Sequence, residues 1–161
     1  MERGFNMGKV RVAAFSFLLS GVFLAICCFL PLKTLVITGG MEETSVLRLM
    51  PSVGGFFVLV LALCCILFPI IGYKSYSALV GAGSAILGGG LLWYYTNSAE
   101  ASAAQVSQVE EEIDGMFSSF SNTPAVETTV TVTTNVGFSL TIIALVLVLI
   151  TGFAYTLVDE N

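Results

Sequence analysis

The chain has 161 residues, of which 56% are hydrophobic and 11% are charged, and its formal net charge is −5. Soluble globular domains carry about 25% charged residues, so this composition indicates an integral membrane protein and excludes a large soluble catalytic domain. The acidic balance also lacks the basic face that nucleic-acid binding requires, and we expect no nucleic-acid partner.

Stretches without Asp, Glu, Lys or Arg predict four transmembrane helices, at about residues 12–30, 52–71, 77–95 and 136–157. A bilayer core is about 30 Å thick and a helix rises about 1.5 Å per residue, so roughly 20 apolar residues cross it. We therefore expect an all-α fold, a four-helix transmembrane bundle that forms a single membrane domain over residues 1–161. The segments 31–51 and 96–135 then lie on the same side of the membrane.

Basic residues gather at the ends of the spans that also carry the two termini. Of the six basic residues, the four at those ends are Arg3, Lys9, Arg11 and Lys74. The positive-inside rule therefore predicts a protein of the cell membrane with both termini in the cytoplasm. The aromatic cluster Trp93, Tyr94 and Tyr95 is expected at the outer interface.

The two outer segments contain runs rich in β-branched residues. Residues 32–38 and 45–49 flank Gly39-Gly40 and predict a small hairpin. Residues 126–134 alternate with period two and predict a further strand, which is able to pair with residues 32–38. We expect these short strands to form part of a small extracytoplasmic cap on the bundle.

An amphipathic helix is the other expected part of that cap. Its apolar positions follow an a/d heptad pattern and comprise Val106, Val109, Ile113, Met116 and Phe120. The acidic run at 110–114 fills the opposite, solvated face. The helix either stands alone or continues the third span. Contiguous apolar surface is usually a contact site, so the stripe either packs on the hairpin or binds a partner.

Small residues recur every four positions in the third span, at Gly81, Ala85 and Gly89. In lipid, small residues let helix backbones approach closely, so this spacing predicts a helix-packing face. Packing inside the monomer and association with a second copy both remain open.

The spans lack the residue types that chemistry in a membrane needs. They contain no ionisable residue of the Asp, Glu, Lys, Arg or His types, which disfavours a proton relay or coupled transport. The cysteines form two adjacent pairs, Cys27-Cys28 and Cys64-Cys65, and are expected to pack rather than to bind metal. We expect no catalytic residues, no metal site and no cofactor.

The order of these segments resembles that of tetraspanins, with a modest first outer segment, a minimal inner turn at 72–76 and a longer second outer segment. The β-prone outer segments look more like those of claudin-type proteins. Segment 31–51 lacks the Trp and paired Cys of claudins, and segment 96–135 lacks the Cys-Cys-Gly of tetraspanins. The resemblance therefore implies topology alone, and such layouts belong mostly to proteins that organise partners.

The expected function is that of a non-enzymatic scaffold or accessory subunit in the membrane. It would contact membrane lipid and bind either a protein partner or further copies of itself. The alternative is an oligomeric pore or channel. A pore should show a polar stripe along one span, and the threonines of the fourth span, Thr141, Thr151 and Thr156, are too scattered to form one.

Overall fold

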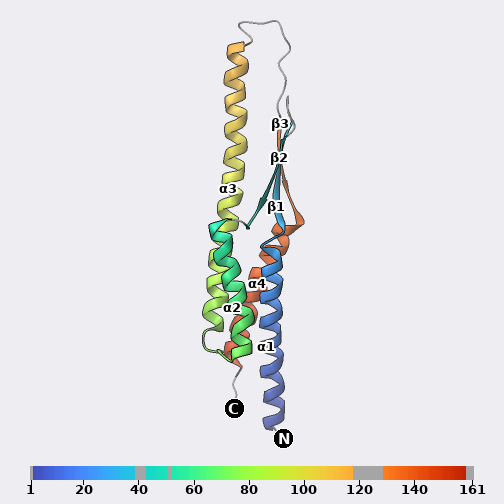
Figure 1. Cartoon of the computed structure of the whole chain (residues 1–161), viewed down its shortest axis with the longest axis vertical. Coiled ribbons are helices and arrows are strands. Elements are labelled where there is room, and N and C mark those ends of the chain that lie inside the picture. The colour runs from blue at the N-terminus through green and yellow to red at the C-terminus, as the bar shows by residue number, and fades with distance from the viewer. Residues whose placement is uncertain (1, 39–42, 51, 118–128, 159–161) are drawn as a thin grey trace.

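The computed structural model describes residues 2–38, 43–50, 52–117 and 129–158. Four helices and three strands make up these ranges (Figure 1). In chain order they are α1 (Glu2–Cys27), β1 (Pro31–Thr38), β2 (Glu43–Arg48), α2 (Val53–Ile71), α3 (Ser77–Phe117), β3 (Thr129–Thr134) and α4 (Val136–Leu157).

Each of the four helices is long and apolar enough to cross a membrane, as the sequence predicts. The candidate spans are Gly8–Cys27, Val53–Ile71, Ser77–Ala101 and Val136–Leu157. The first ends at Cys27 rather than near Leu30, because the chain turns there into β1. Pro31 opens that strand, and a proline disfavours helical geometry at the residue before it.

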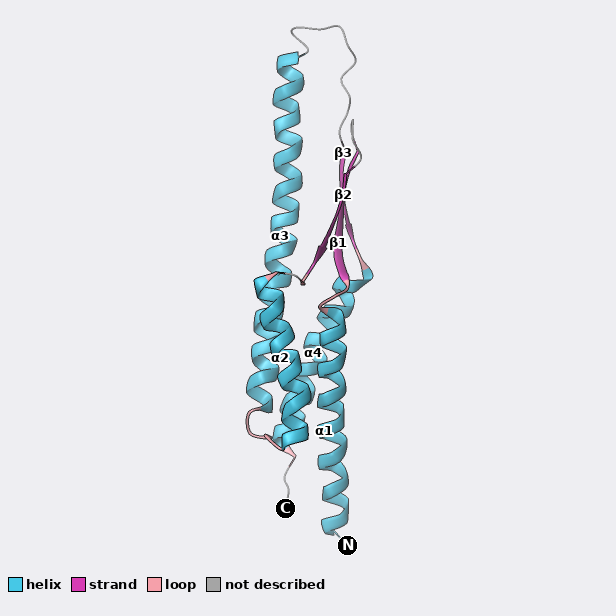
Figure 2. Ribbon diagram, in the orientation of Figure 1, coloured by secondary structure: helices cyan, strands magenta, loops and turns pink. Residues whose placement is uncertain are grey.

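The helices form a closed ring in which α1 packs on α2 and α4, and α3 packs on the same two helices (Figure 2). Fully buried side chains fill the middle of this ring, among them Phe17, Val58, Ala62 and Val148. The Phe17 and Tyr155 rings stack with their centroids 6.2 Å apart. The interior is therefore packed by side chains along the bundle.

The outside of the bundle is also apolar. Leu79, Ile86 and Trp93 recur every seven residues along α3 and are 70–77% exposed. Other large apolar side chains are exposed on all four helices, for example Phe15, Phe56 and Ile150. A helix bundle that is apolar both inside and outside suits a hydrocarbon solvent.

The three strands form one antiparallel sheet in the order β2-β1-β3. The predicted hairpin and the predicted pairing of the third strand with the first are both confirmed. Leu35 lies opposite Ser45 on one side and Val132 on the other. The third strand begins at Thr129, and the predicted residues 126–128 lie outside the described residues.

Directly opposed residues share one face of a sheet, so the register assigns side chains to faces. Lys33, Leu35, Leu47 and Val132 share a face and are buried or half-buried. The opposite face carries exposed threonines such as Thr131. The first face is turned toward α3, because Lys33 makes an ion pair with Glu100 of that helix.

The sheet is joined tightly to the bundle. The backbone N–H of Met50 donates to Cys28 O at 3.1 Å, and that of Asn135 donates to Leu32 O at 2.9 Å. The Asn135 amide also donates to Thr34 Oγ1 at 2.7 Å. Glycine is needed at Gly137, where a Cβ atom would overlap the Pro31 carbonyl oxygen.

The other end of the bundle is closed by a short turn and by the end of α4. Gly72 ends α2 in the left-handed region, with φ 88°. The Lys74 ammonium donates to Val158 O, and Thr156 Oγ1 accepts from Ala78 N at 3.1 Å. The start of α1 lies at this same end (Figure 1).

Helix α3 is a single helix of 41 residues, about 60 Å long. It runs past the end of the bundle and stands beside the sheet (Figure 1). The predicted amphipathic helix is thus the continuation of the third span. We call residues 102–117 of α3 the extension.

Candidate interaction surfaces

The predicted small-residue stripe of α3 approaches the backbone of α4 closely at Gly81. A Cβ atom on Gly81 would lie 2.9 Å from Val148 O, and one on Gly152 would lie 2.9 Å from Ser77 O. The backbones of α3 and α4 therefore approach each other closely at Gly81 and Gly152, one glycine from each helix. Sequence reasoning missed Gly152, whose signal was a glycine in an otherwise bulky apolar span.

The other two members of the stripe, Ala85 and Gly89, lie beside a groove next to α4. A Cβ atom on Gly89 would have no heavy atom within 4 Å, apart from its own helix backbone. Ala85 and Gly89 line a groove of about 440 Å³ between α3 and α4. The neighbouring Gly88 instead lies against α4, since its Cβ atom would lie 2.6 Å from Leu145 Cδ2. Residues at the four-residue spacing thus have different surroundings: Gly81 packs against the α4 backbone, and Ala85 and Gly89 line the groove.

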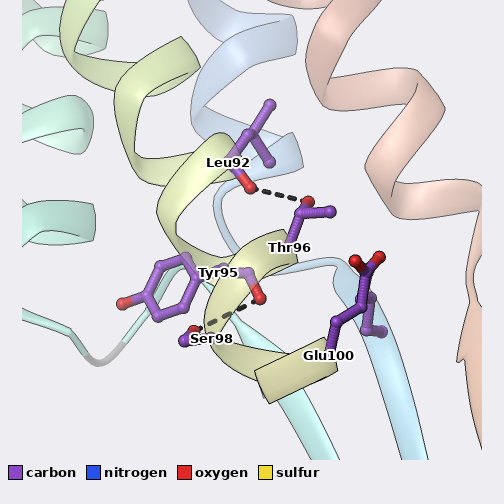
Figure 3. Close-up of polar contacts among 6 residues, drawn as sticks. Leu92, Tyr95, Thr96, Ser98 and Glu100 are labelled. Atoms are coloured by element: carbon purple, nitrogen blue, oxygen red, sulfur yellow. Dashed lines mark hydrogen bonds and ion pairs between the residues drawn. The ribbon is translucent and has the colours of Figure 1, made fainter.

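The groove opens on the outside of the bundle, in the half nearest the sheet. Its rim includes Trp93, Ile142 and Val146, which are 70%, 43% and 49% exposed. Thr96 also lines it, and its hydroxyl donates to Leu92 O at 2.8 Å (Figure 3). Because that hydroxyl bonds to its own helix, the wall offered to a ligand is almost wholly apolar.

A smaller cavity adjoins the groove beneath the sheet. The two share Leu92, Thr96 and Phe138 as lining residues. The smaller cavity is also lined by Lys33, which is 5% exposed. Lys33 Nζ lies 3.6 Å from Glu100 Oε1, and the Glu100 side chain is 65% exposed. Charge-assisted hydrogen bonds are usually about 2.7–2.9 Å long, so this ion pair is loose.

The predicted partner-binding stripe is described in its backbone alone. Val106, Val109, Ile113 and Met116 lie on the helical backbone of the extension. Phe120 lies outside the described residues. The half-buried apolar face of the sheet, with Leu35 and Val132, is turned toward α3. Both the extension and this face therefore stand at the same end of the bundle.

Hydroxyl groups within the spans bond to nearby carbonyls. Ser84 Oγ donates to Val80 O at 2.8 Å, and Thr141 Oγ1 donates to Gly137 O at 2.7 Å. Ser20 and Thr151 share a hydrogen bond of 2.9 Å between α1 and α4. These hydroxyls stabilise helices and helix contacts, which is their usual role in spans.

All four cysteines are free thiols. Cys27, Cys28 and Cys65 are fully buried in the core. They act as packing residues, as their placement inside the spans predicts.

Comparison with known proteins adds no family to this description. The chain matches no known family model, no curated protein and no solved structure. Neither a family match nor a diagnostic motif supports kinship with tetraspanins or claudins, so the likeness to them is one of layout. The surfaces that the structure describes belong to four apolar helices, a three-stranded sheet and the α3 extension.

Proposed function

We propose that this chain is a non-enzymatic, multi-pass protein of the cell membrane that binds a protein partner, or a second copy of itself, through the α3 extension. The observation that carries the proposal is the length of α3. At about 60 Å it is roughly twice the thickness of a bilayer core, and its candidate span ends at Ala101. A helix of that length places the heptad stripe, which begins at Val106, beyond the end of the membrane span.

The charge distribution supports an orientation for this surface. Lys9 and Arg11 lie in the first half of α1, away from its junction with β1, and Lys74 lies in the turn between α2 and α3. All three are therefore nearer the end of the bundle opposite the sheet. By the positive-inside rule that end and both termini are cytoplasmic, and the sheet and the α3 extension form an extracytoplasmic cap. The partner would then bind on the extracytoplasmic side of the membrane.

The cap is suited to binding because it is anchored. β1 is hydrogen-bonded to both other strands, and β3 contacts α3. The Lys33–Glu100 pair adds a further link between sheet and helix. A pre-organised surface loses less conformational entropy on association than a flexible one.

A pore is the weaker candidate. The middle of the bundle is filled by fully buried residues such as Phe17, Val58 and Val148. Conduction would therefore require a path between several copies.

The substitution Ile113→Asp tests the partner role. We expect it to reduce copurification of the partner, or of a differently tagged second copy, by at least about tenfold, because it places a charge in an apolar interface. The unfolding temperature of the purified protein should stay unchanged. Both are measured in mild detergent, by quantitative mass spectrometry and by thermal unfolding.

The matched control is Ala104→Asp, which adds the same charge at an exposed position away from the heptad stripe. It should change neither quantity. If Ile113→Asp lowers the unfolding temperature instead, the stripe packs within the chain. If it changes neither association nor stability, the extension is not the binding element, and either result contradicts the proposal.

A further inference from the structure

We propose that α3 has a hinge at its glycine run, residues 88–90, and that its distal part, residues 91–117, bends there toward α4 and the sheet. The structure describes the open position, and a hydrogen-bonded Lys33–Glu100 ion pair holds the closed position. The motion requires no protein partner, so the hinge can fail its test while the proposed binding role passes, and the reverse.

The part of α3 before the glycine run is fixed to α4. The backbone N–H of Ala78 donates to Thr156 Oγ1 at 3.1 Å. A Cβ atom on Gly81 would lie 2.9 Å from Val148 O, so the two helix backbones are in close contact there. Moving this part of α3 away from α4 would break both contacts, and a bend must therefore lie further along the helix.

The glycine run lies beyond these contacts, and its last two members are not required by packing. A Cβ atom on Gly89 or Gly90 would have no heavy atom within 4 Å, apart from its chain neighbours and its own helix backbone. Glycine weakens a helix relative to alanine, because its backbone has more freedom to leave helical geometry. Glycine is also among the few causes of sharp helix kinks. The run therefore places the most easily bent point of α3 where no contact demands glycine.

One face of α3 is incompletely packed on both sides of this point. Ala85, Gly89, Thr96 and Glu100 share that face, because they recur at multiples of about one helical turn (Figure 3). The groove of about 440 Å³ lies between this face and α4. Glu100 Oε1 lies 3.6 Å from Lys33 Nζ, whereas a charge-assisted hydrogen bond is about 2.7–2.9 Å long. A bend toward this face narrows the groove and shortens the ion pair at the same time.

Shortening the ion pair is favourable because Lys33 has little access to water. Lys33 is 5% exposed and lies among apolar side chains such as Leu92. An ammonium group removed from water is costly unless it is well paired, and a direct hydrogen bond to the Glu100 carboxylate pairs it better. The sheet can stay in place during this motion, since its backbone hydrogen bonds to the bundle at Met50 and Asn135 do not involve α3.

A small bend at the glycine run moves the extension by a measurable distance. Gln105 lies about 22 Å beyond Gly90 along the helix axis. A bend of about 20° therefore moves Gln105 by about 8 Å, and it moves the end of the extension further. The hinge thus sets the distance between the extension and the sheet.

Double electron–electron resonance on the full-length protein in lipid nanodiscs measures this distance. Spin labels are attached at Gln105→Cys in α3 and Thr133→Cys in β3, both at exposed positions, with the four native cysteines replaced by alanine. We expect two distances between the labels, the shorter one from the closed position and differing by about 8 Å. Both should persist when Ile113→Asp is added, because they arise within one chain.

Gly90→Ala tests the hinge without filling the groove, which Gly90 does not line. The fraction of molecules at the shorter distance should fall by about fivefold, because alanine makes it harder for that residue to leave helical geometry. The matched control is Gly83→Ala, which adds the same methyl group to α3 before the glycine run. A Cβ atom on Gly83 also has no heavy atom within 4 Å, so this control should leave both distances unchanged.

Glu100→Gln and Lys33→Gln test the ion pair from its two ends. Each should reduce the fraction at the shorter distance by about tenfold, because a hydrogen bond between charged groups is lost. Arg48→Gln removes an exposed cation from the same sheet and should have no effect. A single distance in the unmodified protein overturns the proposal. So do equal effects of Gly90→Ala and Gly83→Ala, or an unchanged shorter distance in Glu100→Gln.

Discussion

Replacing Gly81 by leucine is expected to lower the unfolding temperature of the detergent-solubilised protein by roughly 5–10 °C. A Cβ atom at this position lies 2.9 Å from Val148 O, which is backbone and cannot turn aside. Overpacking of this kind costs about 1–3 kcal/mol, and a chain of this size loses about 2–4 °C for each kcal/mol. Thermal unfolding followed by circular dichroism measures the change.

Gly89→Leu is the matched control, because it places the same side chain two turns along the same helix. No heavy atom lies within 4 Å of a Cβ atom there, so the unfolding temperature should stay close to that of the unmodified protein. Equal losses at both positions would mean that the stripe packs as one face, as its spacing suggests. No loss at Gly81 would contradict the close approach of α3 and α4.

Gly137→Ala is expected to destabilise the joint between the sheet and the bundle, even though it adds one methyl group. The methyl carbon would overlap the Pro31 carbonyl oxygen and would lie 2.9 Å from Leu30 Cβ. Relief requires the start of α4 to move away from β1, which strains the 2.9 Å hydrogen bond between Asn135 N and Leu32 O. We expect a loss of about 1–3 kcal/mol, measured by thermal unfolding.

The comparison for this change is Gly90→Ala, which also adds one methyl group to a helix. Open space surrounds Gly90, and alanine is favoured over glycine in helices by about 1 kcal/mol. This variant should be as stable as the unmodified protein or slightly more stable. If Gly137→Ala also leaves the unfolding temperature unchanged, α4 and β1 do not approach as closely as the Asn135–Leu32 hydrogen bond indicates, which contradicts the prediction.

The sequence predicts elements well here because the signals are local. Charge-free stretches near 20 residues have few alternatives to a spanning helix, and the period-two alternation around Val130 and Val132 gives a strand. The pairing of that strand with β1 follows because the chain offers few other strands for it to join. The helical part of the extension follows from an apolar periodicity without a proline as far as Phe117, but the sequence leaves open whether that helix continues the third span.

The environment of single residues could not be predicted in the same way. Gly81 and Gly89 have the same residue type and four-residue spacing, yet one faces α4 and the other a groove. The distinction depends on the rotation of α3 about its axis, which the packing of all four helices sets. From the sequence, Lys33 is expected to be an exposed cation of the outer segment. In the structure it is buried, and its burial depends on how the sheet packs against α3.

The orientation of the four helices in a membrane is the claim on which the proposed function rests. Thr133 in β3 and Ser75 in the turn between α2 and α3 are both exposed and lie at opposite ends of the molecule. Single cysteines at these positions, with the four native cysteines replaced by alanine, can be labelled in intact cells with a membrane-impermeant maleimide. The account predicts that Thr133→Cys reacts in intact cells and that Ser75→Cys reacts after permeabilisation alone. The reverse pattern would contradict the orientation, and labelling of both in intact cells would contradict the spanning topology itself.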